Sequence, residues 1–362
     1  MPRMRLADIA AQAGVSPATV SKYLNGHYRE MSEATRARIA EVVERTGYRP
    51  NSTARNLRLD RSHTLGVVLA DIRNPYSSAM LEELSAQAAD AGYALTCAIS
   101  GNDPAKETAA LERLMEAGVD GFIVNTCGGD DERLAEINRR APVVLLDRDI
   151  DPAGAEAGRT APGSSESDAL GTAQSLDLVT SNNAELVSSL VCEVAGSNAA
   201  TCARIHLLTE QDPNSSIRRE RALTFMRELA GRGLAGSTLA LPDDPAAAAR
   251  QLDELAGTSE PLGLIAINGL VFQQLVEAIA ISGLSVPEQL RIATFDEYPW
   301  NRVLFGGVTT AAQDTRAIAT AILELLIGRI VGGEKSDSAL APQRLEIPGR
   351  IIARASTAAQ YA

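Results

Sequence analysis

The stretch "GVSPATVSKYLNG" at residues 14–26 decides how the N-terminal end of this chain folds. Ser16 is a suitable N-cap, and Pro17 suits the first helical position, where its missing N–H costs nothing. Val20 and Leu24 lie one turn apart, so both face a core. A glycine bounds the stretch on each side. These features predict a short helix that begins at a tight turn.

Two further helices are predicted around this stretch. Before it, "MRLADIAAQAG" at 4–14 carries apolar residues at helical spacing, and after it "EATRARIAEVVERTG" at 33–47 does the same. Two short helices joined through Gly-Val-Ser form a helix-turn-helix, whose second helix enters the major groove of DNA. An ordinary pair of packed helices is the alternative interpretation.

The distribution of charge favours DNA. The chain of 362 residues has a formal net charge of −12. Residues 1–61, however, hold eleven Lys/Arg and six Asp/Glu, a net charge of +5, which leaves −17 for the remainder. A basic N-terminal part on an acidic body is typical of a nucleic-acid-binding module joined to a domain that does not contact phosphates.

The segment "YRPNSTARNLRLDRS" at 48–62 extends the basic part. It holds four arginines, and Leu57 lies between Asn56 and Arg58. A helix over Ser52–Leu57 is too short to be stable alone. A linker that folds only on DNA and inserts an apolar side chain into the minor groove fits this pattern. A solvated basic linker is the alternative.

From Thr64 onward, short apolar runs alternate with amphipathic helices, which predicts an α/β fold with parallel sheets covered on both faces. Ligands of such folds bind beyond the carboxyl ends of the strands. Any one polar residue at such an end can simply cap a helix, but five together predict a polar ligand cleft. Those five are Asp71, Asn125, Asp147, Asn268 and Asp296.

Several function classes are disfavoured. Four scattered cysteines and three separate histidines predict neither disulfides nor a metal site. No nucleophile elbow, phosphate-cradling glycine loop or Ser/His/Asp set occurs, so no catalytic residue and no cofactor are expected. The chain has no apolar run of membrane-spanning length and does not start like a signal peptide. We therefore expect a cytoplasmic protein that is not an enzyme.

The motifs "LADIAAQAGVSPATVSKYLNG", "GYRPNSTARNLR" and "SHTLGVVLADIRNPY" resemble the lactose/galactose repressor family, and the resemblance covers nearly the whole chain. It implies a dimer that binds a palindromic operator. By this resemblance, bases are contacted by Pro17, Ala18 and Lys22, and phosphates by Thr19, Ser21 and Asn25. Leu57, beside Arg58, would be the minor-groove wedge. Lys22 is the one groove-facing side chain that can donate to guanine.

The resemblance also implies a two-lobed core like that of periplasmic sugar-binding proteins. It predicts a helix-turn-helix domain over 1–48, a hinge over 49–61 and a core over 62–362. The lobes would comprise about 62–150 with 314–342, and about 176–311 with 343–362. The Gly-, Ala- and Ser-rich segment 151–175 is interpreted as a mobile loop.

The implied effector-binding residues are Asp71, Tyr76, Asn125, Asp147, Arg221, Asn268, Asp296 and Gln313, with Arg148 as a further candidate. The chain departs from the family where Asn268-Gly269 stands for Asn-Asp and Asn182-Asn183 for Asp-Asn.

The segments "SSIRRERALTF" and "FDEYPWNRVLFGGVTTAAQ" resemble the branch of the family that senses keto-deoxy sugar acids. A sugar or sugar-acid effector is therefore expected. A carboxylate suits a bidentate arginine, with Arg221 as the expected partner and Arg218 as the substitute. The alternative is a sugar-binding or transport-type protein with an unrelated basic N-terminus.

Overall fold

The structure is a computed structural model. It describes residues 4–24, 26–48, 61–128, 131–150, 176–196, 202, 204–210, 215–257, 260–332 and 341–358. The chain forms two units, Met1–Ser62 and His63–Ala362. No helix in the described ranges is both long and apolar enough to cross a bilayer.

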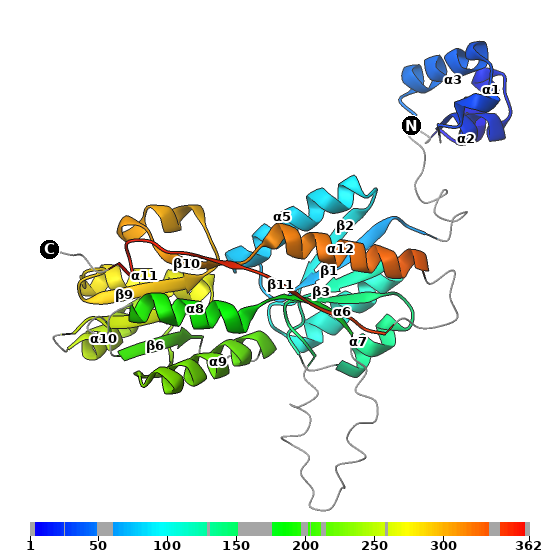
Figure 1. Ribbon diagram of the computed structural model, residues 1–362. Helices are drawn as coiled ribbons and strands as arrows, with labels where there is room; N and C mark the ends of the chain where they lie inside the picture. Colours follow the sequence, from blue (N-terminus) through cyan, green and yellow to red (C-terminus); the bar gives the residue numbers. More distant parts are fainter. Residues whose placement is uncertain are drawn as a thin grey trace, which may run out of the picture. The chain divides into compact units, whose positions relative to one another are not determined.

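The N-terminal unit is a small helical domain (Figure 1). Its helices are α1 (Leu6–Ala13), α2 (Pro17–Leu24), the 3-10 turn η1 (Tyr28–Glu30) and α3 (Glu33–Thr46). Helix α1 ends at Gly14, whose φ of 63° lies in the left-handed region that favours glycine. The core centres on one fully buried side chain from each α-helix, namely Ile9, Val20 and Ile39, and Ala10, Ala13 and Val42 are buried beside them.

The first lobe of the larger unit contains a parallel six-stranded sheet in the order β11-β5-β4-β3-β1-β2. Its strands are β1 (Thr64–Leu69), β2 (Ala94–Ile99), β3 (Gly121–Val124), β4 (Val143–Leu146), β5 (Asp177–Ser181) and β11 (Arg344–Ile347). Helices α5 (Pro75–Asp90) and α12 (Thr315–Gly332) share one apolar cluster with the sheet. Helices α6 (Pro104–Glu116) and α7 (Asp131–Asn138) share another.

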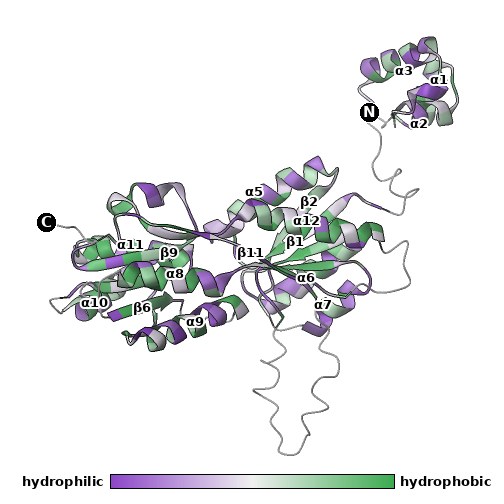
Figure 2. Cartoon of the chain, in the orientation of Figure 1, coloured by the Kyte–Doolittle hydropathy of each residue, from purple (hydrophilic) through white to green (hydrophobic). Residues whose placement is uncertain are grey.

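The second lobe repeats this plan with the order β12-β10-β9-β8-β6-β7, in which only β12 is antiparallel. Its strands are β6 (Arg204–Thr209), β7 (Ala235–Ala240), β8 (Leu262–Ala266), β9 (Leu290–Phe295), β10 (Thr309–Ala312) and β12 (Arg350–Ile352). Its helices are α8 (Asn183–Ala195), α9 (Ser216–Arg232), α10 (Pro245–Ala256), α11 (Gly269–Ser282), and the 3-10 turns η2 (Pro299–Arg302) and η3 (Leu304–Gly306). Figure 2 shows the strands of both sheets chiefly in the green of hydrophobic residues, whereas α9 carries both colours.

Within the described ranges, the chain crosses between the lobes at three places, and hydrogen bonds connect the crossings. Ser181 Oγ donates to Gln313 Oε1 at 2.7 Å, which links the first crossing to the second. Gly349 N donates to Asn182 Oδ1 at 2.8 Å, which links the third to the first. A Cβ on Gly349 would lie 2.8 Å from the Ala312 carbonyl oxygen, so this crossing is closely packed.

These crossings correct the predicted lobe limits. The second lobe was expected to begin at about 176 and to resume at about 343. Strands β5 and β11 instead pair within the first sheet, so the chain crosses near Asn182 and again near Gly349. The apolar pattern alone does not reveal which sheet a strand joins, because buried strands of both sheets are similar apolar runs.

The two lobes place equivalent aspartates in equivalent conformations. Asp147 follows β4 with φ 67°, and Asp296 follows β9 with φ 71°. The N–H of Asp147 donates to the Val179 carbonyl, and that of Asp296 donates to the Ala311 carbonyl. Aspartate tolerates the left-handed region better than most residues. Each lobe therefore turns one aspartate carboxylate away from its strand, at the carboxyl end of that lobe's sheet.

Candidate functional sites

Helix α2 exposes the side chains predicted to contact DNA bases. Pro17, Ala18 and Lys22 are exposed, whereas Thr19 and Ser21 are half-buried. The Thr19 N–H donates to Ser16 Oγ at 3.2 Å, and the two hydroxyl oxygens are 2.9 Å apart. Ser16 therefore serves as the predicted N-cap, which fixes where the helix begins.

Lys22 pairs with Glu30 of η1, a partner that the sequence did not predict. Half of the Lys22 side chain and more than half of the Glu30 side chain remain exposed. The hydrogen bond and charge of Lys22 lower the pKa of Glu30. Exposed ion pairs of this kind are weak, so Lys22 remains available for a stronger acceptor.

Some predicted residues lie outside the described part of the chain. These are Asn25, Leu57 and Arg58, together with most of the hinge and the segment 151–175. Their assigned roles in phosphate contact, minor-groove insertion and loop mobility stay predictions.

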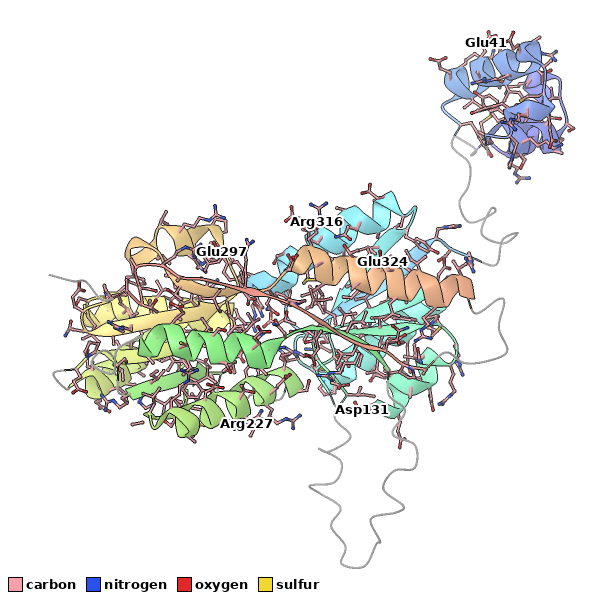
Figure 3. All side chains as sticks on the ribbon, in the orientation of Figure 1. Glu41, Asp131, Arg227, Glu297, Arg316 and Glu324 are labelled. Atoms are coloured by element: carbon pink, nitrogen blue, oxygen red, sulfur yellow. The ribbon has the colours of Figure 1, made fainter. Side chains whose placement is uncertain are left out.

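All eight predicted effector-binding residues line a single cleft in the larger unit. The cleft contains about 490 Å³ of space that no protein atom fills, part of it open to solvent. The remaining lining residues are Asn74, Ser77, Arg148, Ile217, Arg218 and Leu270. Figure 3 shows side chains from both lobes filling the region between them.

Arg221 of α9 is the central cation of the cleft. It is 3% exposed, and its guanidinium lies over the Phe295 ring at 3.7 Å from the centroid. Nε donates to Asn183 Oδ1 at 2.8 Å, and Nη1 donates to the Ile267 carbonyl at 2.7 Å. The buried Nη2 has no hydrogen-bond partner in the described ranges. Arg221 is thus held in place by neutral groups, with one donor left over.

Two buried carboxylates face this cation. Thr180 Oγ1 donates to Asp147 Oδ1 at 3.2 Å, and Gln313 Nε2 donates to Asp296 Oδ1 at 2.5 Å. Burial raises the pKa of both carboxyls, although the positive charge of Arg221 opposes the rise. Each aspartate also has acceptor capacity left for a hydroxyl donor.

The other predicted residues of the cleft differ in how many hydrogen bonds they already make within the protein. The Tyr76 hydroxyl is buried and has no partner among the residues described. Asp71, by contrast, accepts hydrogen bonds from the backbone N–H and the guanidinium of Arg73. Asn268 caps α11 by accepting from Val271 N at 3.0 Å, and its Nδ2 donates to Glu210 at 3.0 Å. Asn268 is therefore a polar residue at a strand end that caps the following helix.

Both departures from the family pattern have structural explanations. A side chain at Gly269 would collide with Tyr298, because a Cβ there would lie 2.8 Å from the Tyr298 hydroxyl oxygen. The Tyr298 ring thus leaves no room for a side chain at position 269. Asn182 Nδ2 donates to Glu185 Oε2 at 2.6 Å, which an aspartate could not do, and Asn182 Oδ1 accepts from Gly349 N. Asn183 Oδ1 accepts from Arg221 Nε.

Glu210 was not predicted, although a signal for it exists. It follows β6 in the run "ARIHLLTE", just as Asp71 follows β1, so the strand-end pattern could have found it. It contacts both Asn268 and Arg218, which line the cleft.

We expect Asp147→Asn to stabilise the ligand-free protein at neutral pH by about 1 kcal/mol. Asparagine tolerates the positive φ and still accepts from Thr180. Because burial raises the pKa of Asp147, the native state holds the proton more tightly than the unfolded chain. Its unfavourable contribution is therefore absent at acidic pH and grows as pH rises through the folded-state pKa.

The measurement is the difference in Tm between variant and parent at about pH 4, near the ordinary aspartate pKa, and at about pH 7. The stabilisation should be larger at the higher pH. Asp253→Asn, which changes an exposed aspartate in the same unit, is the control and should show no such difference. An equal shift at both pH values would contradict the interpretation.

A basic helix-turn-helix unit joined to a two-lobed α/β unit with a polar cleft defines a DNA-binding regulatory protein. Family models match the chain as "Bacterial regulatory proteins, lacI family" over residues 5–51 and "Periplasmic binding protein-like domain" over 199–357. The chain is 32% identical to the HTH-type transcriptional regulator PtxS of Pseudomonas plecoglossicida, over 98% of this chain and 96% of the relative. It belongs to the LacI family of bacterial regulatory proteins.

Two other similarities agree with this assignment. The HTH-type transcriptional regulator KdgR of Bacillus subtilis is 27% identical, over 97% of both chains. The crystal structure of the lac repressor dimer bound to operator and the anti-inducer ONPF matches with a TM-score of 0.75 at 19% identity, over 98% of this chain and 99% of that chain. The predicted fold class and family are confirmed, and the protein is a DNA-binding transcriptional regulator.

We expect Lys22→Ala to weaken operator binding by about 1–3 kcal/mol and to relax specificity at one base pair in each half-site. Lys22 is exposed on α2 and can release the exposed carboxylate of Glu30. The measurement is affinity for the operator and for operators changed at single positions. Equal weakening on all sequences would mean that Lys22 contacts only phosphate.

Proposed function

We propose that the protein is a ligand-responsive repressor of carbohydrate or sugar-acid metabolism genes, which acts in the cytoplasm where its operator DNA lies. It binds a palindromic operator as a dimer and a sugar acid in the cleft. The observation that carries this proposal is the buried Nη2 of Arg221, which faces a polar cleft without a partner among the described side chains. A buried donor of this kind is costly unless a ligand satisfies it.

The chemistry of the cleft favours an anionic, hydroxylated ligand. Arg221 provides a charge-assisted donor for a carboxylate. Asp147 and Asp296 accept from hydroxyl groups, and the Tyr76 hydroxyl can donate or accept. The carboxylate of the ligand would therefore bind at Arg221, with its hydroxyls directed to the aspartates of the two lobes.

The choice of ligand class rests on sequence resemblance to the branch that senses keto-deoxy sugar acids. PtxS and KdgR align with this chain over almost their whole length, so the similarity includes the cleft as well as the helix-turn-helix. 2-Keto-3-deoxygluconate is therefore the first compound to test.

The crossings between the lobes provide a route from the ligand to the DNA. Gln313 contacts Asp296 in the cleft and Ser181 at the first crossing. A ligand held by both lobes would alter this arrangement and move the first lobes of a dimer relative to each other. Such rearrangements couple two sites by about 1–3 kcal/mol, enough to change operator occupancy.

Dimerisation is part of the proposal because one helix-turn-helix reads few base pairs. Helix α5 is the proposed contact. Its inward face is buried in the first lobe, while Glu82, Ser85 and Ala89 are exposed. Sedimentation at micromolar concentration should show a dimer, and a monomer with full operator affinity would contradict this part.

The test of the whole proposal is a thermal-shift screen of sugars and sugar acids, followed by operator binding with and without each hit. A ligand present at a hundred times its Kd stabilises the native state by about 2.7 kcal/mol, which is a clear shift. We expect 2-keto-3-deoxygluconate or a related acid to raise Tm and to change operator affinity. If no sugar or sugar acid does so, the proposed ligand class is wrong.

A further inference from the structure

Three arginines line the cleft, and they differ in their partners. Arg148 donates to Asn102 Oδ1 and to the Thr126 carbonyl, and Arg221 donates to Asn183 and to the Ile267 carbonyl. These acceptors are all neutral. Arg218 is the exception, since its partner is the carboxylate of Glu210.

The contact between Arg218 and Glu210 is close and mostly shielded from water. Nη2 of Arg218 donates to Glu210 Oε1 at 2.8 Å, and Nε lies 2.8 Å from Oε2. The Arg218 side chain is 9% exposed and that of Glu210 is 20% exposed. Asn268 Nδ2 donates to the same carboxylate at 3.0 Å. Glu210 is thus fixed from two sides.

Without Glu210, neither Arg218 nor Arg221, which lie on one helix, would have a carboxylate partner among the described residues. Arg218 and Arg221 are three residues apart on α9, so they are neighbours on its surface. Burial lowers the pKa of Arg218 to about 10, which still leaves the group charged at neutral pH. A pair of adjacent arginines suits a phosphate group, which carries a charge of about −1.5 to −2 at neutral pH.

The formal charge of the cleft is balanced with Glu210 in place. Asp71, Asp147, Asp296 and Glu210 oppose Arg73, Arg148, Arg218 and Arg221, counting the lining residues together with the partners of Asp71 and Arg218. One ligand carboxylate adds a single negative charge, for which Arg221 has a free donor. A phosphate would add about twice that charge beside the carboxylate of Glu210.

We propose that Glu210 is a specificity-determining residue that neutralises Arg218, so that the cleft accepts a singly charged sugar acid and rejects phosphorylated sugars. This inference rests on the proposed function, because it assumes that the cleft is the effector site. A desolvated like-charge contact strongly disfavours binding, which is how Glu210 excludes the phosphorylated ligand.

The experiment compares two matched probes, 2-keto-3-deoxygluconate and its 6-phosphate, by calorimetric titration of the full chain. The parent should bind the unphosphorylated acid at least about tenfold more tightly. Glu210→Gln preserves shape and still accepts from Asn268, but it frees the charge of Arg218. In this variant the preference should shrink by about tenfold or more, through a gain in affinity for the phosphorylated probe.

Two further variants keep the result interpretable. Glu254→Gln removes an exposed charge of the same lobe and should leave the preference unchanged. The double variant Glu210→Gln with Arg218→Gln replaces the ion pair by a neutral pair. It should again reject the phosphorylated probe, and it remains informative if Glu210→Gln alone does not fold.

The outcomes separate this inference from the proposed function. Equal binding of both probes by the parent, or no gain of affinity for the phosphorylated probe in Glu210→Gln, overturns the role of Glu210. If the parent binds neither probe but Glu210→Gln gains affinity for the phosphorylated one, the role of Glu210 stands and the sugar-acid ligand is wrong.

Discussion

Replacing Arg221 by alanine should lower effector affinity by about a hundredfold or more, while the ligand-free protein still binds its operator. The reason is that the positive charge of Arg221 is paired with no carboxylate of the described residues. Its guanidinium is buried over Phe295, it makes no ion pair among the described side chains, and Nη2 has no partner. Titration calorimetry measures the first effect and operator binding measures the second.

Two controls sharpen this prediction. Arg227 lies on the same helix but is exposed on the outside of the second lobe, so Arg227→Ala should bind effector like the parent (Figure 3). Arg221→Lys retains a positive charge but not the planar fork, and should recover only part of the affinity. If Arg221→Ala responds to the same ligand with unchanged affinity, the effector does not bind in this cleft.

Arg329→Met should lower the free energy of unfolding by about 3–5 kcal/mol. Arg329 of α12 donates from Nε and Nη2 to the two carboxylate oxygens of Asp177 on β5, both at 2.8 Å. The side chains are only 13% and 8% exposed. Asp177 also accepts from the N–H of Gln343, just before β11. Removing the arginine therefore leaves a buried charge unpaired where three segments meet.

The double variant Asp177→Asn with Arg329→Met is the test of this mechanism. Asparagine removes the unpaired charge, so the double variant should be clearly more stable than Arg329→Met alone. Urea denaturation of the parent, both single variants and the double variant gives the coupling energy. Equal stabilities of the double variant and Arg329→Met would mean that the effect comes from lost packing.

Part of the cleft could be predicted from the sequence, because several of its residues lie at the ends of parallel strands. Parallel strands end at one edge of the sheet, so Asp71, Asn125 and Asp147 could be grouped from strand positions alone. Arg221, which lies within α9, and Gln313, which follows β10, a strand that the apolar runs did not reveal, came from the family resemblance. The helix-turn-helix was predictable because local residues alone, such as Ser16 and Gly14, set its ends.

The sequence could not show which side chains are already satisfied. Asn268 and Asp147 both follow strands, yet one caps a helix and the other keeps acceptor capacity in the cleft. The Lys22–Glu30 and Arg218–Glu210 pairs each join residues eight positions apart that lie in different elements. Such contacts depend on how the elements pack, which residue spacing does not encode.

The three crossings between the lobes have a consequence for folding during translation. The first lobe is incomplete until nearly the whole chain has been synthesised, because α12 and β11 come after five of the six strands of the second lobe's sheet. Until then, Ile123, Val144 and Val179 lack the side chains of Ile322 and Leu326 that share their apolar cluster. A nascent chain that ends before α12 therefore exposes an apolar face of the first sheet to solvent. Chaperone dependence should therefore be greatest while the second lobe is being translated, and it should fall once α12 has emerged.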